Sequence, residues 1–440
     1  MIYLVPKQDI TPVPQCVEVA PDRPTQKNDL RKLLFFALHE GLFQTFRKVF
    51  SRLDKQSIKD TKVVSARISN TNAISYDGGS TFYWSDVPQE TWKNPFSYDS
   101  LACSKKDDMK VDYLQAKNSL YCVGYGNYVQ TYTRYLQKVF KPRFFVDYSP
   151  EIIKSFDKSF EFSGHDFSVL SEYWAKDDKP IAVIASYHSD HVRQAHTLFK
   201  KNSGGFILVE KPPLVDYQDI QLYRELYYAG ANIQIGFNRR YAPMVRMIKS
   251  NLTFEQPMMI TISVNEVRIS DTHWYHWPNQ GTRITGNACH WIDLCQYFVQ
   301  DKPIKLQLAS STLSQDDSVL LITYQNGSVA VITLTDKGND LRGVQETVEV
   351  KQANVTYRLD DMIHLIVDTP NKGRLKTHKL IRDKGHRRMY QQFQKDILAG
   401  SISEQYPLED LEVVTRVTYE FSTMLVENIS EKKLEWDLNK

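Results

Sequence analysis

Short apolar runs without polar alternation recur between about residues 118 and 243, where they alternate with helical stretches. Such runs predict strands that are buried on both faces, which is typical of parallel sheets. The runs lie in the segments SLYCVG, RFFVD, IAVIA, FILVEK and NIQIG. Regular alternation of strand and helix predicts a doubly wound α/β domain with right-handed crossovers.

Beyond Pro243 the apolar residues recur with a period of two, which predicts a large open, mainly antiparallel sheet. The segment YQNGSV within it is a strong signal for a hairpin turn. Helices are predicted at about residues 286–299, 386–399 and 408–428. We expect the last two helices to return and cover the first sheet.

The first 118 residues lack this rhythm. Several prolines before residue 25 exclude an early helix, a helical segment is predicted at about 28–53, and strands are predicted at 62–69 and 80–84 with a DGG turn between them. No catalytic grouping occurs here, so we expect a structural appendage. The predicted domains are 1–115 (appendage), 116–243 (cofactor binding), 244–385 (antiparallel sheet, substrate and oligomerisation) and 386–440 (closing helices).

A glycine turn follows the first apolar run and opens a helix, which is the order that a Rossmann dinucleotide fingerprint requires. Gly124 suits the tight turn, and Gly126 lets the backbone approach a pyrophosphate. Val129 stands at the position of the third glycine. Asp147 ends the next strand, where a carboxylate accepts hydrogen bonds from ribose hydroxyls and favours NAD over NADP.

Polar residues also follow the later strands. Lys211 stands at the carboxyl end of FILV, where ligands bind in open α/β sheets. Partial burial there would lower the pKa of the amine and make it usable in proton transfer. The alternative is a solvent-exposed lysine before a Pro-Pro turn. His188 and His191 follow the strand at 181–185 and could line the nicotinamide side of the crevice, or cap the next helix.

Composition narrows the function classes. The net charge of +3 over 440 residues gives no reason to expect nucleic acid or an anionic membrane as a partner. No apolar run approaches the roughly 20 residues that span a bilayer, and no secretory signal is apparent. Five cysteines without a CxxC pair suit a reducing cytoplasm, and we expect no metal.

Three motifs in order, EKPP, GFNRRYAP and GTRITGNACHWID, resemble the Gfo/Idh/MocA family of NAD(P)-dependent oxidoreductases. The likeness runs from about residue 118 to 428. Within the family, SYHSDH, GFNRRYAP and RDKGHRRMYQQF are most similar to the C-terminal half of two-part dehydrogenases of bacterial surface-polysaccharide clusters. HEGLFQTFRKVFSRLDK resembles part of their alcohol-dehydrogenase-like half, which implies that residues before about 115 are a reduced remnant.

The resemblance implies specific roles. The turn that wraps the pyrophosphate would be formed by Gly124, Tyr125, Gly126, Asn127 and Tyr128, with Asp147 on the ribose. The nicotinamide would be flanked by Ser186, Tyr187 and His191, with Glu210 and Lys211 beside the cofactor. Catalysis would rest on Lys211, His290 and Asp293. Many members carry Asp four residues before the histidine, where this chain has Gly286.

Candidate substrate contacts come from the strand ends and the loop before the 286–299 helix. Arg239, Arg240 and Arg283 could bind the phosphates of a nucleotide-sugar, or form ion pairs at the surface. His276 lies beside two tryptophans in a loop that suits a sugar face, or forms a loop core. Asn287 follows Gly286 and is a further candidate.

The function predicted is NAD-dependent hydride transfer at a sugar or nucleotide-sugar hydroxyl carbon, in surface-polysaccharide biosynthesis. Two alternatives remain: a glycoside-cleaving enzyme that oxidises its substrate transiently with NAD, and a catalytically weak cofactor-binding scaffold. Members of the Gfo/Idh/MocA family commonly form homo-oligomers through the open face of the antiparallel sheet, so the resemblance implies a homo-oligomer.

Overall fold

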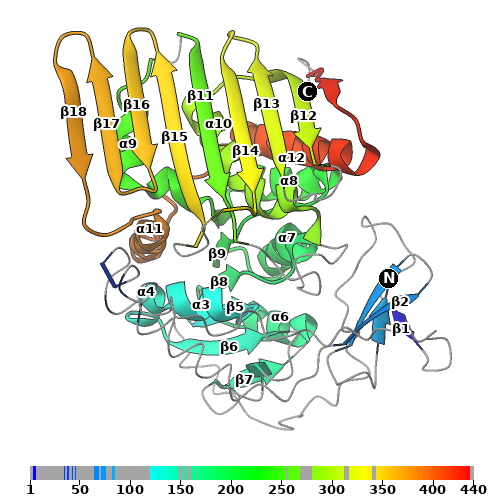
Figure 1. Cartoon of the computed structure of the whole chain (residues 1–440). Helices are drawn as coiled ribbons and strands as arrows, with labels where there is room; N and C mark the ends of the chain where they lie inside the picture. The colour runs from blue at the N-terminus through cyan, green and yellow to red at the C-terminus, as the bar shows by residue number, and fades with distance from the viewer. Residues whose placement is uncertain are drawn as a thin grey trace.

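The structure is a computed structural model. It describes residues 119–147, 160–164, 166–253, 256–267, 280–311, 317–338 and 343–436, together with shorter pieces of the first 118 residues and three positions between 152 and 156. Two sheets dominate these residues, and helices lie between and beside them (Figure 1).

The first sheet has six strands, all parallel, in the order β7-β6-β5-β8-β9-β10. Its strands are β5 (Leu120–Val123), β6 (Pro142–Val146), β7 (Phe162–Gly164), β8 (Ile181–Ile184), β9 (Phe206–Val209) and β10 (Asn232–Ile235). The chain reverses its winding between β5 and β8. Ligands bind at such a switch point, beyond the carboxyl ends of the strands.

Helices cover both faces of this sheet, which explains why its strands lack polar alternation. Apolar residues of β5 pack on one face against helices α3, α4 and α11, and on the other against α6, α7 and α8. The helices are α3 (Asn127–Tyr132), α4 (Arg134–Gln137), α6 (Phe167–Ala175), α7 (His191–Lys201), α8 (Ile220–Tyr228) and α11 (His386–Ala399). Both closing helices were expected to cover this sheet: α11 packs on it, whereas the other one, residues 408–427, packs mainly on the second sheet.

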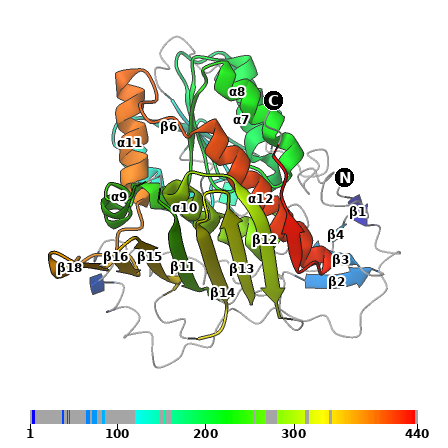
Figure 2. The same ribbon diagram turned by 90° about the horizontal axis from the view of Figure 1, so that it is seen from above.

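The second sheet has nine strands in the order β18-β17-β16-β15-β11-β14-β13-β12-β19, with all neighbours antiparallel except β11 and β14. Its strands are β11 (Met258–Asn265), β12 (Pro303–Ser310), β13 (Ser318–Tyr324), β14 (Val329–Thr335), β15 (Gln345–Gln352), β16 (Val355–Asp360), β17 (His364–Thr369), β18 (Gly373–His378) and β19 (Glu431–Lys433). Alternate residues are buried under α10 (Cys289–Val299) and α12 (Leu408–Glu427). Figure 2 shows these helices on one face of the sheet. The predicted combination of a parallel and a mainly antiparallel sheet is confirmed.

Four further strands form a small antiparallel sheet in the order β1-β4-β3-β2. They are β1 (Tyr3–Val5), β2 (Val64–Ile68), β3 (Thr71–Ser75) and β4 (Phe82–Trp84). The strands predicted at 62–69 and 80–84 correspond to β2 and β4, whereas β3 was not predicted. The DGG turn lies outside the described residues. Within the predicted 28–53 helix, the described positions are helical.

None of the helices in the described ranges combines the length and the apolar character needed to cross a bilayer.

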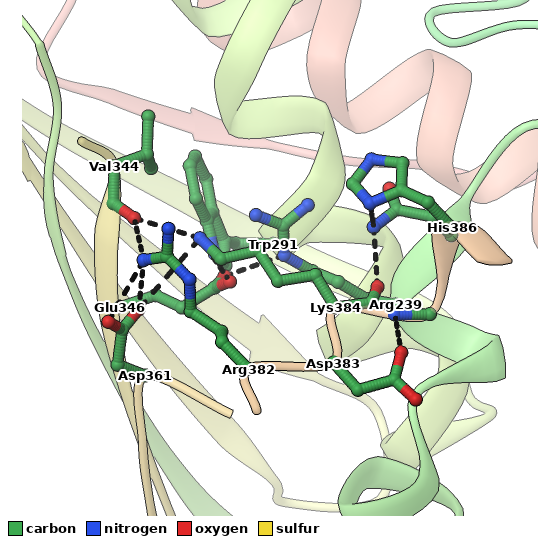
Figure 3. Close-up of polar contacts among 11 residues, drawn as sticks. Arg239, Trp291, Val344, Glu346, Asp361, Arg382, Asp383, Lys384 and His386 are labelled. Atoms are coloured by element: carbon green, nitrogen blue, oxygen red, sulfur yellow. Dashed lines mark hydrogen bonds and ion pairs between the residues drawn. The ribbon is translucent and has the colours of Figure 1, made fainter. Parts of the chain in front are cut away.

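A buried ion cluster joins the second sheet to the segment that leads into α11 (Figure 3). The carboxylate of Glu346 on β15 accepts hydrogen bonds from Arg239 Nε at 2.6 Å and Trp291 Nε1 at 2.7 Å. Lys384 Nζ lies 3.0 Å from its other oxygen. Burial opposes ionisation, yet the charges of Arg239 and Lys384 hold the pKa of Glu346 well below its usual value.

The same segment is fixed by its backbone. The side-chain Nδ2 of Asn238 donates a hydrogen bond to the backbone carbonyl oxygen of Lys384 at 2.6 Å. Gly385 has φ +91°, and a Cβ there would lie 2.0 Å from the carbonyl oxygen of Asn238, so only glycine fits. Arg382 pairs with Asp361 at 3.0 Å. The chain is thereby directed from β18 past Asn238 into α11.

Replacing Glu346 with Gln should destabilise the protein by about 3–5 kcal/mol, because two buried cations lose their counter-charge. Glu349→Gln, on the same strand but in a partly exposed pair with Arg358, should cost about 0–1 kcal/mol. Urea denaturation followed by tryptophan fluorescence measures both. Equal effects of the two substitutions would show that Glu346 does not hold this cluster together.

Candidate functional site

The glycine turn lies at the carboxyl ends of β5 and β8. Gly124 has φ +83°, and a Cβ there would lie 2.4 Å from the carbonyl oxygen of Ala185, so this position requires glycine. A Cβ at Gly126 would meet no atom within 4 Å, so the space over the turn is open. Val129, at the third glycine position, is buried against the sheet and fills the contact that a glycine would leave.

Asp147 lies beside this turn at the end of β6. Its Oδ2 accepts a hydrogen bond from the backbone N–H of Tyr125 at 2.6 Å. The residue is 6% exposed, so its carboxyl group lies in a largely buried position at the rim of the turn. The predicted ribose carboxylate is thus brought to the predicted pyrophosphate turn.

The end of β8 is tied to its surroundings by polar side chains. Ser186 Oγ donates to Gln194 at 2.6 Å. The backbone N–H of His188 donates to Gln280 Oε1 at 3.0 Å, and its ring Nδ1 lies 3.0 Å from the carbonyl oxygen of Gln280. Because Gln280 is fully buried just before α10, these contacts join the parallel sheet to the other half of the site. Tyr187 is buried beside them.

His191 joins the ends of two neighbouring strands. Its ring nitrogens lie 2.8 Å from the carbonyl oxygen of Pro212 and 3.2 Å from that of Ser186. Burial lowers the pKa of His191 to about 4, so the ring is neutral at physiological pH. His191 is the first residue of α7, but the N-cap position is Asp190 and no side chain caps this helix, so the alternative in which His191 caps the helix is not what the structure shows.

Glu210 is a buried carboxyl on which three elements converge. Its Oε1 accepts hydrogen bonds from the hydroxyls of Tyr128 on α3 at 2.8 Å and Tyr390 on α11 at 2.9 Å. A Cβ at Gly236 would lie 2.7 Å from its other oxygen, so glycine makes room for it. Burial raises the pKa of Glu210 to about 7.

Lys211 connects the two halves of the site directly. Its Nζ donates to the carbonyl oxygen of Gly286 at 2.7 Å. Gly286 lies in a π-helical turn, Ile284–Ala288, that leads into α10; such turns occur often at functional sites. Burial lowers the pKa of Lys211. The alternative of a lysine in solvent is therefore not what the structure shows.

His290 follows this turn on α10. Its Nδ1 is buried and has no hydrogen-bond partner among the described residues. Burial, and then the positive charges of Arg239 and Lys211, lower the pKa of His290 well below its usual value. The ring is therefore neutral, with the nitrogen that could accept a proton within electrostatic reach of Lys211.

Asp293 forms hydrogen bonds with Arg240 and Tyr406 and not with His290. Its Oδ1 accepts hydrogen bonds from Arg240 Nε at 2.8 Å and from the hydroxyl of Tyr406 at 2.5 Å. Arg240 also donates to Asp410 at 2.8 Å, so its charge is neutralised inside the protein. Asp293 and His290, three residues apart, form no hydrogen bond with each other. Asp293 thus ties α10 to Arg240 and Tyr406 rather than orienting the histidine ring.

The other predicted substrate contacts differ in their surroundings. Arg239 is 4% exposed and committed to Glu346, and its guanidinium lies 4.7 Å from the centre of the Trp291 ring. Arg283 donates to the carbonyl oxygen of Val267 at 2.9 Å, with Glu266 at 3.3 Å. Asn287 is half-buried in the π-helical turn. His276 and the side chain of Asn127 lie outside the described residues.

Several residues that contact the predicted site residues or the helix after the glycine turn were not predicted from the sequence: Gln280, Glu346, Lys384, His386 and Tyr390. The ring of His386 stacks on Tyr132 of α3 with centroids 4.6 Å apart, and burial lowers the pKa of His386 to about 3. The motif RDKGHRRMYQQF could have marked three of these residues. Glu346 occupies an inward-facing position of a strand with period two. A carboxylate at such a position is by itself a sequence signal of a buried ion pair, because a buried charge needs a partner.

Among the described residues, no group of three or more histidine, cysteine, aspartate and glutamate side chains is placed to hold a metal ion.

The raised pKa of Glu210 predicts a pH-dependent loss of stability. In the unfolded chain the carboxyl ionises near pH 4.5, whereas in the folded protein it ionises near pH 7. As the pH rises from about 4.5 to about 7, the free energy of unfolding should therefore fall by about 3 kcal/mol in total. Glu210→Gln should escape this loss, so its stability relative to the wild type should rise between pH 4.5 and 8.

Urea denaturation at pH 5 and pH 8 measures this difference. Tyr390→Phe should move the window to higher pH, because one hydrogen bond that favours the carboxylate is removed while the ring is kept. An unchanged stability difference between wild type and Glu210→Gln at the two pH values would contradict the assignment.

Comparison with solved structures finds the same fold in several dehydrogenases. No protein-family model matches the chain, and no curated protein matches it. Among solved structures, levoglucosan dehydrogenase in complex with NADH has a TM-score of 0.59 and 16% identity over 73% of this chain and 100% of its own. WlbA dehydrogenase from Bordetella pertussis, in complex with NADH and UDP-GlcNAcA, has a TM-score of 0.58 and 16% identity over 73% of this chain and 99% of its own.

GenD2 from gentamicin A biosynthesis, in complex with NAD, has a TM-score of 0.59 and 18% identity over 73% of this chain and 97% of its own. Identities this low show a shared fold. The two-sheet architecture expected from the Gfo/Idh/MocA resemblance is therefore the architecture of these dehydrogenases.

Proposed function

We propose that the protein is an NAD-dependent oxidoreductase that transfers hydride between a sugar or nucleotide-sugar hydroxyl carbon and the nicotinamide. The observation that carries the proposal is the 2.7 Å contact between Lys211 Nζ and the carbonyl oxygen of Gly286. It joins the strand ends beside the glycine turn to the π-helical turn that precedes His290.

The cofactor side is supported by the fit of the residues present. The open space over Gly126 can receive a pyrophosphate, and Asp147 lies at the rim where a ribose would lie. A carboxylate at this place accepts hydrogen bonds from the 2′-hydroxyl of NAD and repels the 2′-phosphate of NADP. Tyr125, Tyr128 and Glu210 would shape the remainder of the cofactor site.

The nicotinamide, when bound, would accept or return the hydride. The residues of this chain would supply the proton transfer, since oxidation of an alcohol needs a base within hydrogen-bond reach of the hydroxyl. His290 is neutral and has an unpartnered Nδ1, so it can take the proton. Lys211, whose pKa is lowered by burial, would orient the hydroxyl and share the proton.

The position of Gly286 explains how Lys211 is oriented. Many members of the family that this chain resembles carry an aspartate at this position, and its carboxylate can orient the histidine ring. Here the residue contributes its backbone carbonyl, and that oxygen accepts from Lys211. Proton transfer would therefore depend more on the lysine, with His290 held by α10 and not by a carboxylate.

The substrate class is supported by the ligands of similar structures. Levoglucosan dehydrogenase was solved with L-sorbose, and WlbA with UDP-GlcNAcA. Because Arg239 and Arg240 are each neutralised by buried carboxylates, we propose that they shape the wall of the substrate site. Arg283 and Asn287 would be the closer contacts. A role in surface-polysaccharide biosynthesis is part of this proposal.

Lys211→Met should lower turnover about 10²–10⁴-fold, the usual contribution of acid-base catalysis, while NAD still binds. Turnover is measured by NADH absorbance across a panel of sugars and nucleotide-sugars, and NAD binding by calorimetry. Lys200→Met, an exposed lysine on α7, is the matched control and should keep full activity. Turnover that survives Lys211→Met would contradict the role of this lysine.

The same assay separates the alternatives. An enzyme that oxidises its substrate transiently to cleave a glycosidic bond would convert substrate without accumulating NADH, and a weak scaffold would bind NAD without turnover.

Asp147→Asn should reduce the preference for NAD over NADP, because the charge that repels the 2′-phosphate is removed. Calorimetric titration of each variant with both dinucleotides gives the ratio of affinities. Asp166→Asn, which keeps a cap on α6, is the control and should leave the ratio unchanged. Wild-type protein that binds NADP as tightly as NAD would contradict this role of Asp147.

A further inference from the structure

Two exposed histidines meet at the edge of the nine-stranded sheet, on strands that take no part in the crevice. His364 begins β17 and His378 ends β18, the last strand on that side. The two residues are directly paired across the antiparallel ladder. Their side chains therefore lie on the same face. Leu365, the next residue, is buried in the core, so the histidines lie on the face away from it.

The rings present the same nitrogen to each other. The two Nδ1 atoms lie 2.9 Å apart, and the ring centroids are 4.4 Å apart with an interplanar angle of 34°. Each neutral imidazole carries one proton and one lone pair. In one pair of tautomers, Nδ1–H of one ring donates a hydrogen bond to Nδ1 of the other. When both rings carry the proton on Nε2 instead, the two lone pairs face each other and can bind one cation together. That arrangement is a bidentate chelate.

The spacing selects a type of ion. Histidine nitrogens bind first-row divalent metals at about 2.0–2.1 Å. Two such bonds at a right angle place the nitrogens about 2.9 Å apart, whereas a tetrahedral angle places them about 3.4 Å apart. The observed 2.9 Å fits the right angle. Cu²⁺ and Ni²⁺ favour this tetragonal geometry, and imidazole is a ligand that both accept.

A carboxylate lies on the other side of the pair. Asp360 on β16 is directly paired with His364, so Asp360, His364 and His378 form a row across three neighbouring strands. All three side chains are exposed. The carboxylate adds negative charge beside the chelate, and water would fill the remaining positions around the ion.

We propose that His364 and His378 form a two-histidine chelating site for a divalent transition-metal ion of the Cu²⁺ or Ni²⁺ type, which ties the edge strand β18 to β17. The site is independent of the proposed enzymatic function. Among the described histidines, those of the crevice are largely buried, and His196 already has its Nε2 bonded to Glu225 at 2.8 Å.

Calorimetric titration of the tag-free full chain with NiCl₂ tests the site. Wild-type protein should bind one more Ni²⁺ per chain than either His364→Gln or His378→Gln, since each substitution removes one arm of the chelate. His196→Gln is the matched control and should bind Ni²⁺ as the wild type does. Equal stoichiometry and affinity in wild type and both pair variants would overturn the proposal.

Hydrogen exchange gives a second readout. Ni²⁺ should slow exchange of the amides at residues 373–378 in the wild type, because the ion fastens a strand that is otherwise held on one side only. The effect should be absent in His378→Gln. Ni²⁺ binding without slower exchange in β18 would place the ion elsewhere and would also overturn the proposal.

Discussion

The contact between the Lys211 ammonium and the carbonyl oxygen of Gly286 is the interaction on which the site depends. An amine withdrawn from solvent needs a hydrogen-bond acceptor, and Lys211 is partly buried. The acceptor comes instead from the π-helical turn of the other half of the protein. The same bond therefore satisfies the lysine and ties the end of β9 to the turn that leads into α10.

Buried charge elsewhere in the crevice follows a common rule. Each arginine next to the site faces a carboxylate: Arg239 faces Glu346, and Arg240 faces Asp293 and Asp410. Removing one partner of such a pair is costly because the other stays buried and charged. The arginines are thereby held in place, whereas Nδ1 of His290 has no hydrogen-bond partner among the described residues.

Glu210 and the segment at 382–386 extend this rigidity to the cofactor side. Glu210 receives hydroxyls from α3 and α11, and α11 is directed there by the contacts of Lys384 and Gly385. The helix that opens the glycine turn is thereby braced by a helix from the end of the chain. A cofactor bound at the turn would be held by elements from both halves of the molecule.

The sequence alone determined what depends on local periodicity and on single backbone positions. Uninterrupted apolar runs identified five of the six parallel strands, all except the short β7. Period two identified the antiparallel sheet, and Gly124 marked the turn, because these signals arise from burial and from φ angles within a few residues. Motif resemblance then picked out Lys211 and His290. Only the tertiary structure decided which charges meet: Asp293 pairs with Arg240 and not with His290 three residues away, Glu346 neutralises Arg239 from more than 100 positions along the chain, and Tyr390 reaches Glu210 from α11. Such pairings depend on how distant elements pack, and a sequence pattern carries no record of the distance between residues that are far apart in the chain.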